Sequence, residues 1–229
     1  MELLAFGDQG WGDEIFKATL MTIAVAIVAF ILGLLFAFLI VSLKLSKYKI
    51  LNFFGNTYTT VFRGIPELLI IYLFFFGSSG AIMYVAKIFG YNEYIEINAF
   101  IVGALSIGII SGAYSTEVLR GAILSLNIGQ FEGAKALGLK KTTYYFTVIL
   151  PQVIRIALPN LSNVWQITLK DTSLISVTGL VEIMRQSYIA AGSTRNPLLF
   201  YLFAAVVYLI LTTFSIKFFN KIEKKYNFI

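Results

Sequence analysis

Histidine and cysteine are both absent from the 229 residues of this chain. Their absence excludes disulfides, thiol nucleophiles, Cys/His zinc sites and acid–base schemes that depend on imidazole. Charge is scarce as well, since 13% of the residues are charged against about 25% in soluble domains. Hydrophobic residues make up 58% of the chain, above the usual level of about 45–50%. The composition therefore predicts an integral membrane protein that is not an enzyme.

Long stretches without charge indicate where the chain crosses the membrane. Residues 18–43, 97–116 and 196–216 form charge-free stretches of 26, 20 and 21 residues, and about 20 apolar residues cross a hydrocarbon core. Two further stretches are apolar but carry charges. We expect an all-α integral membrane protein with five transmembrane helices, at about residues 18–43, 55–76, 97–119, 152–175 and 197–219.

The second helix has two possible positions. The stretch 55–76 carries charges and a proline in its first half, whereas the uncharged run 68–86 would shift the helix outward. We prefer 55–76, because the sequence Gly-Ser-Ser-Gly at 77–80 is typical of a helix end.

All four prolines lie at positions that bear on the helices. Pro151 and Pro197 are placed to open the fourth and fifth helices, since a proline in the first turn loses no hydrogen bond. Pro66 and Pro159 would lie inside spans, where they kink a helix. Such kinks are either simple bends or broken helices that line a substrate path.

The basic residues predict the orientation. With the N-terminus outside, eleven Lys and Arg residues fall inside and four outside, while Arg63, Arg155 and Lys170 lie at membrane depth. The positive-inside rule then favours an outside N-terminus and an inside C-terminus. Residues 1–17 form the outer segment, 18–219 the membrane domain and 220–229 a cytoplasmic tail. The net charge of +6 is thereby explained without a nucleic-acid partner.

Small residues recur every four positions in the third span, at Ala104, Gly108, Gly112 and Thr116. This stripe predicts the close approach of another helix, and a pore-lining face only in second place.

Two charge pairs have helical spacing: Glu117 with Arg120, and Arg63 with Glu67. Each pair either neutralises itself at a helix end or contacts a substrate, and the sequence leaves both open.

The loop 121–150 has the composition of ordered structure. Residues 131–138 predict a short helix closed by glycine, which is either a docking element for a soluble partner or an interfacial helix. The chain has no Gly-x4-Gly-Lys-Ser/Thr loop, so any nucleotide chemistry belongs to another chain.

The same loop reads Glu132-Gly133-Ala134, three residues, Gly138, nine residues and Val148-Ile-Leu150-Pro151. It resembles the signature of the permease subunits of bacterial ATP-binding cassette importers: Glu-Ala-Ala, three residues, Gly, nine residues and Ile-x-Leu-Pro. Gly133 and Val148 are the departures. The segments 63–69, 90–96, 112–121 and 169–176 are similar to the branch for histidine, arginine, lysine/ornithine and octopine, and the resemblance covers about residues 15–225.

The resemblance implies a type-1 importer-like permease that moves a polar, basic amino acid of the arginine, histidine, lysine or ornithine type from periplasm to cytoplasm by alternating access. It implies two cytoplasmic ATPase subunits, a second permease subunit that is identical or paralogous, and a periplasmic substrate-binding protein. ATP and Mg are expected in the ATPase, and neither a cofactor nor a metal in this chain. The protein would lie in the bacterial inner membrane.

The loop helix would then be the coupling helix, which docks on the ATPase. The positions that match the signature and are expected to couple are Glu132, Gly133, Ala134, Gly138, Leu150 and Pro151.

Polar residues at membrane depth are the candidates for the substrate path: Arg63, Glu67, Ser115, Glu117, Arg155, Lys170, Asp171 and Ser173. We predict that Glu117 or Asp171 faces this path. An ion-coupled secondary transporter is the alternative function, although the five predicted spans show no internal repeat.

Overall fold

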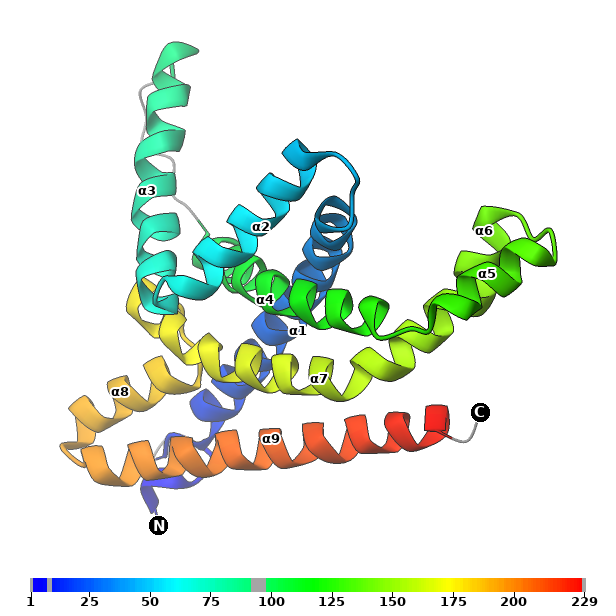
Figure 1. Cartoon of the computed structure of the whole chain (residues 1–229). Coiled ribbons are helices and arrows are strands. Elements are labelled where there is room, and N and C mark those ends of the chain that lie inside the picture. The colour runs from blue at the N-terminus through cyan, green and yellow to red at the C-terminus, as the bar shows by residue number, and fades with distance from the viewer. Residues whose placement is uncertain (1, 8–9, 92–97, 228–229) are drawn as a thin grey trace.

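The structure is a computed structural model, and it describes residues 2–7, 10–91 and 98–227. These residues form helices and short connections (Figure 1). The α-helices are α1 (Gly12–Lys44), α2 (Lys49–Gly64), α3 (Glu67–Ile88), α4 (Ala99–Leu124), α5 (Ile128–Ala136), α6 (Lys141–Tyr144), α7 (Leu150–Asp171), α8 (Ile183–Thr194) and α9 (Pro197–Asn227). Short 3-10 helices cover Glu2–Leu4 and Thr172–Thr178, and a π-helical turn covers Tyr145–Ile149.

Within the described ranges, four helices are long and apolar enough to cross a membrane: α1, α3, α4 and α9. The fourth predicted span, 152–175, corresponds to α7, whose 22 residues extend over about 33 Å at 1.5 Å per residue. It is more polar than the other four, since it contains Arg155, Lys170 and Asp171. The chain is thus an all-helical membrane protein with four apolar spans and a polar fifth long helix.

The centre of the molecule is the close contact between α1 and α4. A Cβ atom built on Gly33 of α1 would lie 2.8 Å from Ser111 Oγ and 3.1 Å from the Gly112 amide nitrogen of α4. A Cβ atom on Gly108 would lie 3.0 Å from the Cβ atom of Leu32. Only glycine allows the backbones to approach this closely. The expectation that the small-residue stripe of the third span is a packing surface is confirmed.

The predicted second span was wrong. The chain forms two helices around Pro66, because the residue before a proline is pushed out of the α region, and Ile65 has φ −97° and ψ 138°. Pro66 is the N-cap of α3 instead of a kink within a helix. Residues 77–80 lie inside α3, so they do not end a helix. The uncharged run that we ranked second, 68–86, lies within the single apolar helix α3.

Pro151 and Pro159 both fall in α7, as expected. Pro151 lies in its first turn, and Pro159 lies in its interior. The turn before Pro151 is π-helical, with the Leu150 amide donating to the Tyr145 carbonyl five residues back. Since Pro151 has no N–H, it cannot continue the α-helical ladder backwards. Pro197 opens α9, which also agrees with the expectation.

Other boundaries differ more modestly. The third and fifth predicted spans are longer in the structure, because α4 continues to Leu124 and α9 to Asn227. α7 ends at Asp171 and gives way to the 3-10 helix Thr172–Thr178. The amphipathic helix α8 was not predicted. Of the segment 90–96 that resembles the family, residues 92–96 lie outside the described residues.

α5 and α6 project from the body of the molecule as an arm (Figure 1). The root of this arm is a hydrophobic cluster to which several helices contribute. Its buried members are Ala37, Val41, Leu119, Ala122, Ala134, Tyr144, Ile149, Val153 and Ala157. Because α1, α4, α5 and α7 all contribute, the arm is packed against the membrane helices themselves.

Candidate functional site

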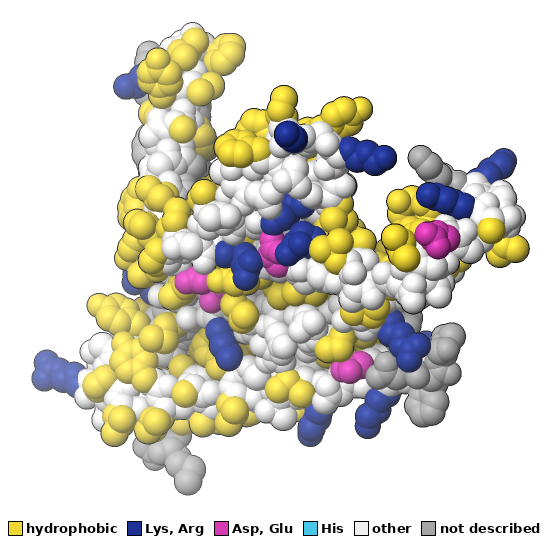
Figure 2. Space-filling model, in the orientation of Figure 1, with side chains coloured by type: hydrophobic (Ala, Val, Ile, Leu, Met, Phe, Trp, Pro, Cys, Tyr) yellow, Lys and Arg dark blue, Asp and Glu magenta, His cyan; other side chains and the backbone are white. Residues whose placement is uncertain are grey.

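Charged side chains of both signs gather in the middle of one face, over α4 and the adjoining ends of α2 and α3 (Figure 2). Charges within the membrane-spanning part of a protein are costly unless they are paired or face a watery cavity. The contacts of these side chains divide them into two groups, here named the central cluster (Arg63, Glu67, Tyr114, Lys170 and Asp171) and the ion-pair network (Lys44, Thr59, Glu117 and Arg120).

Tyr114 is the middle of the central cluster. The Arg63 guanidinium lies over its ring, with Cζ 5.4 Å from the ring centroid. The Tyr114 hydroxyl donates to Glu67 Oε1 at 3.3 Å. Arg63 is near the end of α2 and Glu67 begins α3, so the break at Pro66 is what brings both side chains to the same aromatic ring. The predicted pairing of Arg63 with Glu67 is replaced by a shared contact with Tyr114.

Asp171 adds a second carboxylate to this cluster. It is the last residue of α7, and it lies close enough to Glu67 and Lys170 for their charges to interact. Asp171 and Glu67 are half-buried, while Arg63 and Lys170 are exposed. Three separate parts of the chain, α2–α3, α4 and α7, thus bring two acids, two bases and a phenol together.

Ser115 lies next to Tyr114 in α4 and is fully buried. Its Oγ has no hydrogen-bond partner among the described residues. One turn earlier, Ser111 Oγ accepts a hydrogen bond of 3.0 Å from Thr168 Oγ1 of α7. The contact between α4 and α7 behind the central cluster is therefore partly polar.

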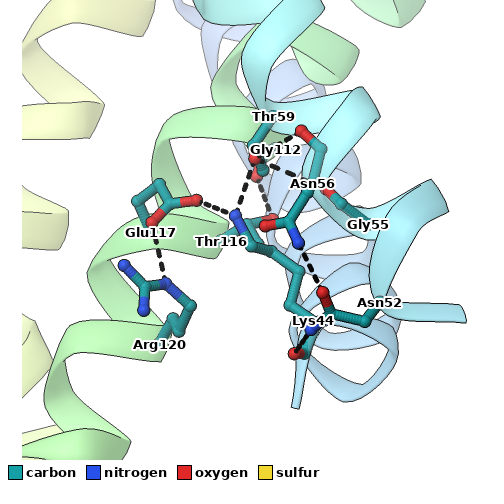
Figure 3. Close-up of polar contacts among 9 residues, drawn as sticks. All are labelled: Lys44, Asn52, Gly55, Asn56, Thr59, Gly112, Thr116, Glu117 and Arg120. Atoms are coloured by element: carbon teal, nitrogen blue, oxygen red, sulfur yellow. Dashed lines mark hydrogen bonds and ion pairs between the residues drawn. The ribbon is translucent and has the colours of Figure 1, made fainter. Parts of the chain in front are cut away.

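Glu117 belongs to the ion-pair network (Figure 3). Its Oε1 is paired with Lys44 Nζ at the end of α1, and its Oε2 accepts from Arg120 Nε at 2.9 Å. Lys44 also donates to Thr59 Oγ1 of α2 at 2.8 Å, and its side chain is only 7% exposed. The contacts of Glu117 and Lys44 therefore hold α1, α2 and α4 together. Glu117 also forms the ion pair with Arg120 that their spacing allows. The pair lies within α4 and not at its end.

The backbone at the end of α1 is tied to the same network. Asn52 Nδ2 donates to the Lys44 carbonyl at 2.5 Å, and Asn56 Nδ2 donates to Asn52 Oδ1 at 2.6 Å (Figure 3). The last carbonyls of a helix have no partner within it, so Asn52 supplies one. The network closes the α1–α2 turn as well as the contact with α4.

Arg155 and Ser173 contribute no side chain to the central cluster. Arg155 is four turns from Asp171 along α7, at a distance of about 24 Å. Ser173 donates to the Lys170 carbonyl at 2.8 Å and lines a hollow of about 350 Å³ with Met184, Tyr201 and Tyr208. The eight candidates are thus not a single site.

The first part of the coupling signature, residues 132–138, lies on the arm. Ala134 is buried at the root, while Glu132 and Gly133 are exposed on α5. Gly138 ends α5 with φ +66°, donating to the Lys135 carbonyl, and Leu139 donates to the Ala134 carbonyl. This is a Schellman motif, which requires a residue in the left-handed region. The glycine that closes the loop helix has the role expected from the sequence.

Leu150 and Pro151, the end of the signature, form the first turn of α7 at the other side of the arm. A Cβ atom built on Gly133 would meet no atom within 4 Å. Alanine, the residue that the family signature has there, would fit this chain without any rearrangement.

Sequence reasoning missed three polar residues: Tyr114, Lys44 and Glu182. Tyr114 was one of the residues quoted for the resemblance, and Lys44 was counted only for orientation. Glu182 is fully buried, accepts from the amides of Met184 and Arg185 at the start of α8, and accepts from the Tyr208 hydroxyl at 3.1 Å. A carboxylate directly before a helix is a cap signal that could have located α8.

Glu182 lies between the apolar spans, in the connection that leads into α8. Burial raises the pKa of its carboxyl group to about 7, against the lowering effect of the two amides and of Tyr208. The connection therefore contains an acid that titrates near neutrality. Within the described ranges, no group of three or more acidic residues could hold a metal ion.

Comparison with known proteins gives consistent matches. The profile of a family described as binding-protein-dependent transport system inner membrane component matches residues 29–226. The chain is 47% identical over 224 residues to the octopine transport system permease protein OccQ of Rhizobium radiobacter, covering 98% of this chain and 94% of that protein. It is 32% identical over 207 residues to the arginine ABC transporter permease protein ArtQ of Escherichia coli K12, covering 85% and 87%.

Among solved structures, the chain is similar to a crystal structure of an amino acid ABC transporter with histidines. The TM-score is 0.79 at 28% sequence identity, and the alignment covers 94% of this chain and 95% of that one.

Proposed function

Since the chain belongs to the binding-protein-dependent transport system inner membrane components, the permease subunits of bacterial ATP-binding cassette importers, we propose that it carries a basic amino acid or a derivative with a guanidinium group into the cell. The chain is a non-catalytic, multi-pass protein of the bacterial inner membrane. Octopine and arginine, for which two of the relatives are named, both carry a guanidinium group and a carboxylate.

The central cluster is the substrate site in this proposal. Glu67 and Asp171 would bind the cationic end of the substrate, and Arg63 or Lys170 its α-carboxylate. Carboxylates bind guanidinium groups through paired, charge-assisted hydrogen bonds, and an aromatic face attracts the same cation. The observation that carries the proposal is the Arg63 guanidinium over the Tyr114 ring, 5.4 Å from the centroid, beside the Glu67 carboxylate.

The other carboxylate that we considered, Glu117, is left out of the substrate site. Both of its oxygens are already bound, to Lys44 and to Arg120. A substrate cation would have to displace a side chain that is 7% exposed. Asp171 is therefore the residue of the predicted pair that faces the path in this proposal.

Permeases of this family work with ATPase subunits. We propose that α5 is the coupling helix and that exposed Glu132 and Gly133 contact a cytoplasmic ATPase. The full importer would contain two ATPases, a second permease subunit and a periplasmic binding protein. ATP-driven closure of the ATPases would move the two arms together and open the path outward.

The topology in this proposal has five membrane-spanning helices: α1, α3, α4, α7 and α9. The N-terminus is outside and the C-terminus inside, which puts the basic tail of α9 and the arm in the cytoplasm. α7 is accepted as a span although it is polar, because intramembrane charges that face a substrate path are tolerated.

Coupled uptake by the reconstituted importer tests the substrate site. With saturating loaded binding protein, Glu67→Gln and Asp171→Asn should lower arginine uptake about tenfold or more, since one charge-assisted hydrogen bond is worth roughly 1.5–3 kcal/mol. Basal ATP hydrolysis should persist. Glu117→Gln, a matched neutralisation outside the cluster, should leave the uptake per folded importer within about twofold, although it lowers the stability of the fold.

Unchanged uptake of every cationic substrate in both cluster variants would refute the site. Uptake that persists without ATP and follows an ion gradient would instead support a secondary transporter.

A further inference from the structure

A groove of about 450 Å³ runs between α1, α7 and α9, away from the central cluster and the arm. Aromatic rings form its walls: Phe30 of α1 and Trp165 of α7 pack edge to face at 5.4 Å, and Trp165 lies 6.4 Å from Phe219 of α9. Ser215 also lines it, and its hydroxyl is already bound to the Leu211 carbonyl at 2.8 Å. The groove is therefore mostly apolar, and the buried Trp165 Nε1 is a donor without a hydrogen-bond partner among the described residues.

The α9 side of the groove is open to the surroundings. Phe214 is 68% exposed and Phe218 is 62% exposed, although both line the groove. α9 is one of the apolar helices that are able to cross a membrane. Where α9 crosses the bilayer, hydrocarbon chains can reach these rings and enter the groove sideways.

Basic residues follow the groove toward the C-terminus of α9. Lys221 and Lys225 come three and seven residues after Phe218, which places them on the same helix face. Both are exposed. Glu223 comes four residues after Phe219 and lies on the side turned toward α7. An apolar slot with two lysines at its polar end has the charge and polarity pattern of an anionic phospholipid.

We propose that this groove is a binding site for one anionic phospholipid. An acyl chain lies against Phe30, Trp165 and Phe218, and the phosphate group is held by Lys221 and Lys225. Juxtamembrane lysines attract anionic headgroups because anionic lipids give the membrane surface a negative potential. The site does not depend on the substrate proposal, since it shares no residue with the central cluster.

Trp165 is the natural reporter for this site. The chain has two tryptophans, Trp11 and Trp165. Trp11→Phe keeps the edge-to-face contact with Phe200, 6.4 Å away, and leaves Trp165 as the single indole. The full-length Trp11→Phe chain is reconstituted in phosphatidylcholine vesicles, and increasing fractions of phosphatidylglycerol or phosphatidylcholine with brominated acyl chains are added. Bromine quenches the Trp165 fluorescence when the chain occupies the groove.

Brominated phosphatidylglycerol should reach half-maximal quenching at a fraction about 25-fold lower than brominated phosphatidylcholine does. Each lysine is expected to contribute about fivefold to this preference. Lys221→Gln with Lys225→Gln should abolish it. Lys47→Gln with Lys49→Gln, two exposed lysines at the turn between α1 and α2, is the matched control and should retain the preference.

Ser215→Leu fills the groove and should lower quenching by both lipids. Equal quenching by the two lipids, or an unchanged preference in the Lys221/Lys225 variant, would overturn the proposal and identify ordinary contact with bulk lipid. Both lysine variants change exposed side chains only, so the test stands even if Ser215→Leu disturbs folding. Loss of quenching on addition of a partner permease subunit would show that a protein helix, and not a lipid, is the occupant, and would also overturn it.

Discussion

Glu117→Gln should destabilise the fold while leaving the substrate site intact. The variant removes the negative charge that lies between Lys44 and Arg120, and it keeps the size and shape of the side chain. Lys44 is 7% exposed and would be left with Thr59 Oγ1 and a neutral amide as partners. The fold would then contain a nearly buried ammonium group without its counter-charge.

The magnitude follows from the exposure of each partner. Breaking a fully buried pair costs about 3–5 kcal/mol, and an exposed pair contributes about 0–1 kcal/mol. Glu117 is 19% exposed, so the Lys44 pair is close to the buried limit without reaching it, whereas Arg120 is 38% exposed. We expect Glu117→Gln to lower the free energy of unfolding by about 2–3 kcal/mol, and Arg120→Gln by less than about 1 kcal/mol.

Equilibrium unfolding in mixed detergent and SDS micelles, followed by circular dichroism, measures these values. Lys44→Met completes a double-mutant cycle with Glu117→Gln, and the coupling energy should exceed about 1 kcal/mol. The reasoning is refuted if Glu117→Gln costs no more than Arg120→Gln, or if the coupling energy is near zero. The ion-pair network would then be a solvated surface pair.

Three further predictions concern the arm, the central contact and the α8 connection. Gly138→Ala forces alanine to φ +66°, which costs about 1–2 kcal/mol and should speed amide hydrogen exchange over residues 128–136. Gly133→Ala, with free space around its Cβ, should slow the exchange of the same amides. Gly33→Ala puts a methyl group 2.8 Å from Ser111 Oγ, so the free energy of unfolding in SDS should fall by about 1–3 kcal/mol. An unchanged unfolding transition would contradict the close contact between α1 and α4. Because the pKa of Glu182 is raised to about 7, its contribution to stability is fully present below about pH 4.5 and is lost as the pH rises through 7. Glu182→Gln should flatten this part of the plot of unfolding free energy against pH. A variant whose plot runs parallel to that of the parent protein would count against the buried acid.

The apolar helices were predictable because their signal is local. A charge-free stretch such as 18–43 can hardly do anything other than cross the bilayer, and it lies within α1. The stripe of small residues in α4 was equally readable, since close helix packing requires it. In both cases the pattern of one segment determines the outcome.

Pro66 shows where local signals conflict. A proline and two charges within an apolar stretch were interpreted as a kinked span, and the glycines at 77–80 as its end. The preference of Ile65 for extended backbone decided the break, and in α3 the Ser78 hydroxyl donates to the Phe75 carbonyl at 3.2 Å, which lets a serine continue the helix. A helix lying in lipid has little alternative for its backbone groups, so turn-forming residues lose their effect.

The candidate site depended on contacts between distant segments. Spacing along α4 correctly paired Glu117 with Arg120, but it could not reveal Lys44, which is 73 residues away in sequence. Tyr114 was likewise invisible as a centre, because its partners come from α2 and α3. Such groupings are determined by the crossing of helices, which the sequence of a single segment does not encode.

The root of the arm has a mechanical consequence. Ala134 of α5 packs in the same hydrophobic cluster as Ala37 of α1, Leu119 of α4 and Ala157 of α7. A push on α5 would therefore be transmitted to three long helices at once, since close-packed interiors have low compressibility. Bending has to occur elsewhere, and Pro159 lies just beyond the cluster in α7 where one backbone hydrogen bond is missing. An arm that moves would therefore act as a lever with its pivot near Pro159 of α7 and not at its own base.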